Sequence, residues 1–343
     1  MTRRCLVPAG AAIVLAVWSS QAPLAGQAPA TKAAAGPSAT RAYTPPRTPD
    51  GQPDLQGFWT NSTYTPLERP DKITKEFYTP EEALAAEKQA AARESEQTTP
   101  GTVADVHYDF SQFALDRSQA PLARNLRTSL IVDPPNGRLP TLTPTGQKRA
   151  AERQEESKRI GRWDSAESNQ LDDRCIIMRG AGPPMMDAGY NSNYQIVQAP
   201  GYVMILTEMI HDVRIIPLDG RPQPHANVRQ WMGVSRGRWD GNTLVIETTN
   251  FNGKNPFSGS SEQIRVTERL TRIADDAIRY QFTVEDPATW VRPWSAEASM
   301  LKVHGPIFEH ACHEGNYGLY NTLVGARLEE KKAAEAAAKK GSK

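Results

Sequence analysis

The feature that most constrains the fold of this 343-residue chain is a two-residue alternation of apolar and polar side chains in its second half. In the stretch 277–285, every second residue from Ile278 to Val284 is large and apolar, and the residues between them are polar. Successive side chains of a strand point to opposite faces of its sheet, so this pattern predicts strands that bury one face. One-sided burial is typical of antiparallel sheet.

Turn signals divide this half of the chain into short strands. Asp240-Gly241, Asp275-Asp276 and Pro200-Gly201 favour tight connections between strands. We expect strands at about residues 194–197, 202–208, 213–216, 238–239, 243–248, 264–273, 277–285, 297–303 and 307–311. The sequence therefore predicts a mainly β fold, an antiparallel meander that forms a curved sheet or a barrel around a pocket, because an open meander leaves edges that must be covered.

A few helices are expected in the first half. Thr79 followed by Pro80 and two glutamates is typical of a helix start, and the Ala-rich run continues this helix to about Arg93. Thr143-Pro144 predicts a second helix to about residue 159, and residues 129–132 predict a short strand between the two helices.

The chain begins with the features of a signal peptide over residues 1–26. Arg3 and Arg4 precede an apolar stretch, and small residues follow near 25–28. This predicts a periplasmic or secreted protein and leaves the general secretory and twin-arginine routes open. No later apolar run is long enough to predict a transmembrane helix.

Composition divides the remainder into segments. Residues 27–53 are rich in Ala, Pro and Thr and predict a flexible tether. We then expect an N-terminal segment with helices and short strands at 54–170, the antiparallel β domain at 171–326, and a charged helical or disordered tail at 327–343. The oligomeric state is left open.

Charge and motifs exclude several classes of function. Forty Lys and Arg against 39 Asp and Glu give a net charge of +1, so no basic excess indicates a nucleic-acid partner. The sequence lacks a Gly-x-Ser-x-Gly elbow, a phosphate-binding glycine loop and a dinucleotide fingerprint, which disfavours the common serine hydrolases and nucleotide enzymes.

Two cysteines, Cys175 and Cys312, remain after the signal peptide. In an oxidising compartment an even count favours a disulfide, and the alternatives are buried free thiols or a metal site. Met178, Met185 and Met186 follow Cys175 and suit a core or pocket wall, or with thiols a copper(I) site.

Aromatic residues are dense in the sheet region, with arginines beside some of them. A tryptophan next to an arginine suits a pocket that stacks rings and fixes an anion, although core packing explains the same residues. The candidate ligand-binding residues are Tyr194, Tyr202, Trp231, Trp239, Trp290, Trp294 and Arg292.

The densest polar constellation is the stretch 309–314. His310, His313 and Glu314 are candidate catalytic residues together with His211, which Asp212 follows. His310 and His313 are also weak candidate metal ligands, because no recognised ligand spacing accompanies them. No cofactor is indicated.

The stretches 190–195, 229–233, 235–244 and 311–317 together resemble a widespread family of exported bacterial proteins of unknown function. The resemblance extends over roughly residues 53–327; it implies export and transfers no activity. Separately, Gly57-Phe58-Trp59 resembles the opening of the first strand in calycin or lipocalin-like β-barrels.

Three functions from different classes are consistent with these features. The first is an exported protein that binds a small molecule in a pocket lined by Trp, Tyr and Met. The second is a metal-dependent periplasmic enzyme centred on His310, His313 and Glu314. The third is a structural or partner-binding envelope protein, suggested by the tether and the charged helices.

Overall fold

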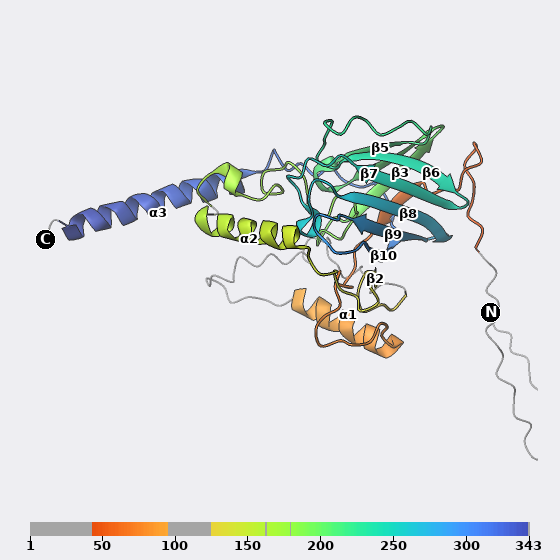
Figure 1. Ribbon diagram of the computed structural model, residues 1–343, viewed down its shortest axis with the longest axis horizontal. Coiled ribbons are helices and arrows are strands. Elements are labelled where there is room, and N and C mark those ends of the chain that lie inside the picture. The colour runs from red at the N-terminus through yellow and green to blue at the C-terminus, as the bar shows by residue number, and fades with distance from the viewer. Residues whose placement is uncertain (1–42, 95–124, 162, 179, 342–343) are drawn as a thin grey trace, which may run out of the picture. The chain divides into compact units, whose positions relative to one another are not determined.

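The computed structural model describes residues 43–94, 125–161, 163–178 and 180–341 (Figure 1). The signal peptide and the first part of the tether that we expect lie outside these residues. Residues 43–53, expected to end the tether, contact the sheet: the Tyr43 hydroxyl donates to Asp275 Oδ1 at 2.9 Å, and Arg47 Nη2 donates to Asn242 Oδ1 at 2.8 Å.

Ten strands of the described chain form one antiparallel sheet, as the alternation predicts. They are β1 (Gly57–Thr60), β2 (Ile131–Asp133), β3 (Asn193–Ala199), β4 (Tyr202–Thr207), β5 (Val213–Pro217), β6 (Val234–Asp240), β7 (Thr243–Thr249), β8 (Arg265–Ala274), β9 (Ala277–Glu285) and β10 (Trp294–Lys302). The strands curve round one another in Figure 1.

The order of the strands is β5-β4-β3-β1-β10-β9-β8-β7-β6, and β2 pairs with β10 outside this path. Strands β3 to β5 form one meander and β6 to β10 form another. The four-residue strand β1 joins the two meanders, because it pairs with β3 on one side and with β10 on the other.

The two end strands, β5 and β6, close the sheet almost completely into a barrel. They lie side by side without a ladder of backbone hydrogen bonds. Arg214 of β5 reaches across inside the barrel and donates from Nη2 to Ser235 Oγ of β6 at 3.2 Å. We call the gap between these two strands the seam.

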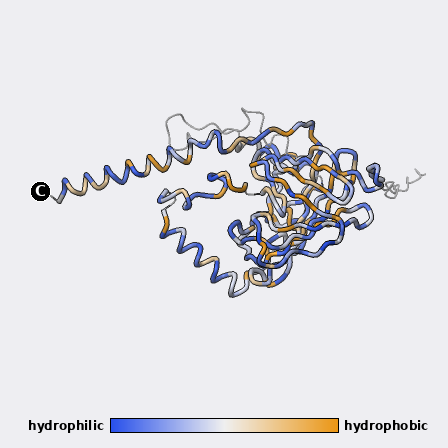
Figure 2. The backbone as a smooth tube through the Cα atoms, turned by 90° about the horizontal axis from the view of Figure 1, so that it is seen from above, coloured by the Kyte–Doolittle hydropathy of each residue, from blue (hydrophilic) through white to orange (hydrophobic). Residues whose placement is uncertain are grey.

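Inward-facing side chains fill the interior of the barrel. Trp59, Tyr194, Tyr280, Phe282 and Trp294 are all fully buried there. Figure 2 shows that hydrophobic segments concentrate in the region of the strands. The centre of the barrel is therefore a packed core, and open space is found at its end and at its seam.

The described residues also form three α-helices, α1 (Pro80–Glu94), α2 (Pro144–Arg159) and α3 (Tyr317–Gly341), besides short 3₁₀ turns. The expected caps of the first two are confirmed, since Glu82 N donates to Thr79 Oγ1 and Gly146 N donates to Thr143 Oγ1. The third helix begins ten residues before the tail expected at 327. In the described residues, no helix is long and apolar enough to cross a membrane.

The strand predicted at 307–311 is wrong, because these residues have no regular secondary structure. Strand β10, which precedes them, already pairs with β9 along one edge and with β1 and β2 along the other. The stretch has no free strand edge beside it, and Phe308 is 75% exposed.

Candidate functional site

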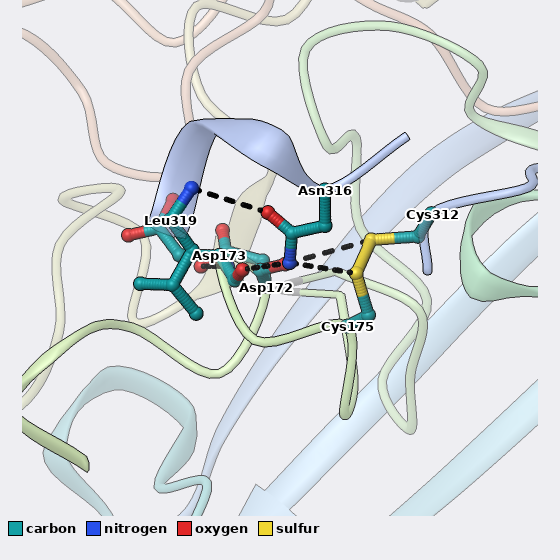
Figure 3. The surroundings of a disulfide bond; sticks show 6 residues. All are labelled: Asp172, Asp173, Cys175, Cys312, Asn316 and Leu319. Carbon is teal, nitrogen blue, oxygen red and sulfur yellow. Dashed lines mark hydrogen bonds between the residues drawn. A yellow bond between two sulfur atoms is a disulfide. The ribbon is translucent and has the colours of Figure 1, made fainter. Parts of the chain in front are cut away.

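The disulfide between Cys175 and Cys312 is confirmed, with their Cα atoms 5.7 Å apart (Figure 3). Asn316, near the start of α3, lies beside it and donates from Nδ2 to Asp173 O at 2.8 Å and to Cys175 Sγ at 3.4 Å. The bond therefore fixes the segment before α3 to the segment that precedes β3.

That preceding segment, of which residues 171–178 and 180–190 are described, contributes to a second apolar cluster at one end of the barrel. Ile177, Met178 and Ala181 are buried here with Met209 and Ile210. Met185, a little further along, is buried in the main core. Met178 and Met185 thus fill space in the two cores, in keeping with the core interpretation of these methionines.

Two tyrosines of the barrel anchor the loop 180–186. Tyr280 Oη accepts from Met185 N at 2.8 Å, and Tyr194 Oη donates to Gly180 O at 3.3 Å. Burial, followed by the charge of Glu268, raises the pKa of the Tyr280 hydroxyl well above its ordinary value, so this hydroxyl remains protonated. The loop is therefore tied to the rigid core beneath it.

A cavity of about 510 Å³, which we call the mouth cavity, lies above this loop. It is at the end of the barrel where β6 and β8 begin and β7 ends. Its wall is formed by Gln170, Leu171, Asp172, Ile177, Gly180, Gly182, Pro183, Pro184, Trp231, Phe251, Gly253, Asn255, Pro256, Phe257, Ser258, Ser260, Ser261 and Ile264.

The wall of the mouth cavity combines aromatic rings with neutral polar groups. Trp231, Phe251 and Phe257 supply the rings, and Gln170 and Asn255 supply amides. Asp172 is the one charged residue among the described residues that line it. Such a wall suits a neutral or cationic ligand with an apolar face and hydrogen-bonding groups.

The connection between β7 and β8, residues 250–264, provides half of this wall and is held from below. Asp286 accepts from Ser261 N at 2.6 Å and from Ser261 Oγ at 2.8 Å. The ring of Phe257 stacks on Trp294 with centroids 5.9 Å apart and planes 20° apart. The loop is therefore positioned by the core, as a preformed binding site requires.

A second cavity of about 680 Å³, the seam cavity, lies between the facing ends of β5 and β6. It is lined by Ile176, Asp212, Val213, Arg214, Ile215, Arg229, Gln230, Trp231, Met232, Gly233, Val234, Ser235 and Arg236. All of the stretch 229–233, one of those through which the sequence resembles the exported family, belongs to this wall. Trp231 lines both cavities.

Beneath the seam cavity, Arg214 forms an ion pair with Glu268 of β8 inside the barrel. Nη1 and Nη2 of Arg214 donate to Glu268 Oε1 and Oε2 at 3.1 and 2.5 Å, and the two side chains are 3% and 0% exposed. The Tyr280 hydroxyl donates to Glu268 Oε1 at 2.8 Å. The same network thus extends from the seam to the loop under the mouth cavity.

The structure distributes the predicted ligand-binding residues over several environments. Trp231 lines the mouth cavity, and Trp294 lies directly behind its wall against Phe257. Trp290 packs edge-on against Trp294, with centroids 5.7 Å apart. Tyr194 is buried and serves as an anchor of the loop below the cavity.

The other three predicted ligand-binding residues lie elsewhere. Tyr202 is on the outside of the barrel, where Arg221 Nη2 donates to its hydroxyl at 3.0 Å. Trp239 packs near the hairpin turn between β6 and β7, at the end of the barrel opposite to the mouth cavity. Arg292 is exposed and donates from Nη2 to Asp133 Oδ2 at 2.5 Å.

The described residues contain no group of three or more His, Cys, Asp or Glu side chains placed to hold a metal ion. His313 and Glu314 are exposed, and His310 is half-buried in the irregular segment before α3. His211 belongs to a single 3₁₀ turn, Met209–His211, between β4 and β5. These four residues therefore form no metal centre.

The sequence interpretation did not identify most of the residues that line the mouth cavity, such as Phe251, Asn255 and Phe257. One signal was present: the stretch 250–264, rich in Gly, Asn and Ser, is too long for a simple hairpin turn. Long connections of this kind in a compact domain are often functional.

Comparison of the sequence with models of protein families and with curated proteins finds no match. The candidate site is therefore defined by its own geometry.

Proposed function

We propose that this protein binds a small molecule in the mouth cavity. The observation that carries the proposal is a cavity of about 510 Å³ whose walls are held by the core from two sides. Ligand sites are typically preformed clefts of roughly 300–1,000 Å³ that combine apolar walls with a few fixed polar groups.

The chemistry of the wall limits the ligand. Trp231, Phe251 and Phe257 would stack on a ring or an apolar face, while Gln170 and Asn255 would bind its polar substituents. Asp172 favours a neutral or cationic molecule and disfavours an anion. A sugar, a polyol or an aromatic amine fits this description.

We also infer that the protein functions outside the cytoplasm. The disulfide supports this location, because intracellular thiols are normally kept reduced. The signal-peptide features of residues 1–26 support the same inference.

The proposal is tested by ligand-observed NMR with a panel of neutral, cationic and anionic ring-bearing fragments. Gln170 is exposed at the rim of the cavity, so Gln170→Trp should fill the entrance without disturbing the core. We expect neutral or cationic fragments to bind the wild type and to lose binding in this variant.

The matched control is Gln154→Trp, which places the same ring on the exposed surface of α2, at a residue that does not line the cavity. Fragment binding should be unchanged in it. Binding that survives Gln170→Trp, or a panel in which no neutral or cationic fragment binds, would contradict the proposal. A second variant, Asp172→Asn, should weaken the cationic fragments and spare the neutral ones.

A further inference from the structure

Helix α3 leaves a row of large apolar side chains uncovered along one face. Its members, with exposed fractions between 39% and 72%, are Tyr317, Tyr320, Val324 and Leu328. Residues three or four apart lie above one another on a helix, so the four side chains form one continuous surface, which we call the α3 stripe. The stripe exposes on the order of 500 Å² of apolar surface, close to the largest patch of a typical monomer.

The opposite face of α3 holds the helix against the rest of the protein. Leu319 and Leu323 are half-buried on this face. Arg327 donates from Nη1 to Asp164 O and from Nη2 to Trp163 O, both at 2.9 Å. Because these contacts fix the orientation of the helix, the α3 stripe cannot turn inward and stays exposed in a single copy of the chain.

Opposite charges flank the α3 stripe at equal distances. Glu314, in the turn 312–316 that leads into the helix, precedes Tyr317 by three residues, and Lys331 follows Leu328 by three residues. Glu314 and Lys331 are both exposed, and neither forms an ion pair with another described residue. A surface with this pattern is complementary to a second copy of itself that runs in the opposite direction.

We propose that two copies of this chain associate through their α3 stripes, with the helices antiparallel and a two-fold axis through the middle of the stripe. In this register Tyr317 packs on the partner's Leu328, and Val324 packs on the partner's Asn321. These four residues follow the alternating spacing of three and four that a coiled coil uses. The same contact occurs on both sides of the axis, as a two-fold interface requires. The proposal does not depend on either cavity.

The flanking charges select the antiparallel arrangement. This arrangement places Glu314 of each copy beside the partner's Lys331, so that an ion pair forms at each end of the α3 stripe. A parallel arrangement would place each of these residues beside its own counterpart, where like charges repel each other. Charge complementarity therefore specifies the direction of the partner helix as well as its identity.

The size of this interface fits a weak, concentration-dependent dimer. The two helices overlap over residues 314–331, which is roughly 26 Å of helix. The α3 stripe and its flanking polar groups bury about 500–700 Å² on each copy, at the low end of specific interfaces, which bury about 800 Å² per partner. We therefore expect a dissociation constant in the micromolar range.

A lipid surface is the competing occupant of an exposed apolar helix face. A helix that lies in a membrane interface keeps its apolar face along its length. In α3 the face that carries the stripe continues with Lys331 and Glu335, and both are exposed. The short stripe with charges of both signs beside it thus favours a second copy over a membrane.

The test is sedimentation velocity of the full chain at concentrations from about 1 to about 200 µM, where we expect the mass to rise from monomer toward dimer. Val324→Glu should weaken association at least about tenfold, because two added carboxylates meet near the axis. The matched control is Val291→Glu, which places the same charge on an exposed valine outside α3 and should leave association unchanged. A chain that stays monomeric throughout, or a Val324→Glu variant that associates like the wild type, would overturn the proposal.

A charge swap tests the register. Lys331→Glu should weaken association about tenfold, since both ion pairs of the dimer become repulsive. Adding Glu314→Lys to this variant should restore the wild-type affinity, whereas Lys340→Glu, exposed beyond the paired residues, is the control and should have little effect. A swap that fails to restore association would refute the antiparallel register. Binding to phosphatidylglycerol vesicles that is lost in Val324→Glu, without self-association of the wild type, would assign the stripe to a membrane surface instead.

Discussion

The ion pair between Arg214 and Glu268 predicts a large and specific loss of stability when one partner is neutralised. In Glu268→Gln, an amide replaces a carboxylate that accepts two hydrogen bonds from Arg214 and one from Tyr280, at a site that is 0% exposed. The guanidinium is then left buried without its counter-charge. Breaking a buried pair in this way costs about 3–5 kcal/mol.

The loss is measured by urea unfolding followed by tryptophan fluorescence, with the slope m expected to stay unchanged because the same surface is exposed on unfolding. The double variant Arg214→Met with Glu268→Met should recover most of the stability, since apolar residues of similar volume replace a buried pair at little net cost. In the double-mutant cycle formed by the wild type, Arg214→Met, Glu268→Met and the double variant, the coupling energy should exceed about 2 kcal/mol.

The control is the pair of Arg238 and Glu247 on the outside of the barrel, whose side chains are 60% and 38% exposed. Neutralising it through Glu247→Gln should cost less than about 1 kcal/mol. If Glu268→Gln costs no more than this control, Arg214 and Glu268 do not form a buried pair in the folded protein.

Three further predictions concern the surroundings of the two cavities. The raised pKa of Asp212, about 6 against 3.8, means that the folded state holds this proton more tightly than the unfolded chain. The contribution of Asp212 to stability is therefore lost as pH rises from about 4 to about 6, so Asp212→Asn should match the melting temperature of the wild type at pH 4 and exceed it at pH 7; parallel melting profiles of the two proteins would contradict this. Reduction of the Cys175–Cys312 bond, which closes a loop of 137 residues and so restricts the unfolded chain, should lower the free energy of unfolding by up to about 5 kcal/mol in urea titrations with and without reductant. An unchanged midpoint would contradict this expectation. Asp286→Ala removes the acceptor for Ser261, so hydrogen exchange of residues 258–263 should accelerate while that of β3 to β5 stays the same, and uniform acceleration would indicate a general loss of stability instead.

Local pattern was enough to predict most of the elements. The alternation indicated each strand from β3 to β10, although for β6 it gave only residues 238–239, and recognisable turns join β3 to β4, β6 to β7 and β8 to β9. The helix starts at Thr79 and Thr143 were also predicted, since capping is decided by a few adjacent residues. The disulfide was predicted because only Cys175 and Cys312 follow the expected signal peptide.

What depends on distant pairing was not predicted. The four residues of β1 are too few to show a period, and their place between β3 and β10 is set by partners more than 130 residues away. The stretch 307–311 has strand-like composition but no free edge to pair with. The cavity walls combine loops from four parts of the chain, an arrangement that periodicity does not encode.

One signal of the buried network was visible in the sequence. Glu268 stands between Val266 and Leu270 in the row of residues that faces the core, where a charge is costly unless it is paired. Arg214 occupies a similar position in β5. A charged residue in an apolar row of a strand is thus a useful indicator of an interior ion pair.

The insertion of β1 between the two meanders has a consequence for how the polypeptide reaches its native state. A fragment that starts after residue 170 would contain eight of the strands, arranged in the two meanders. The edges of β3 and β10 that pair with β1 would then have no hydrogen-bond partners and could pair with another copy of the fragment. Pairing across so long a separation in sequence is slow, so the last step of assembly should be the docking of Gly57–Thr60 between the meanders. In this chain the short strand β1 therefore joins two separate meanders into one nearly closed barrel.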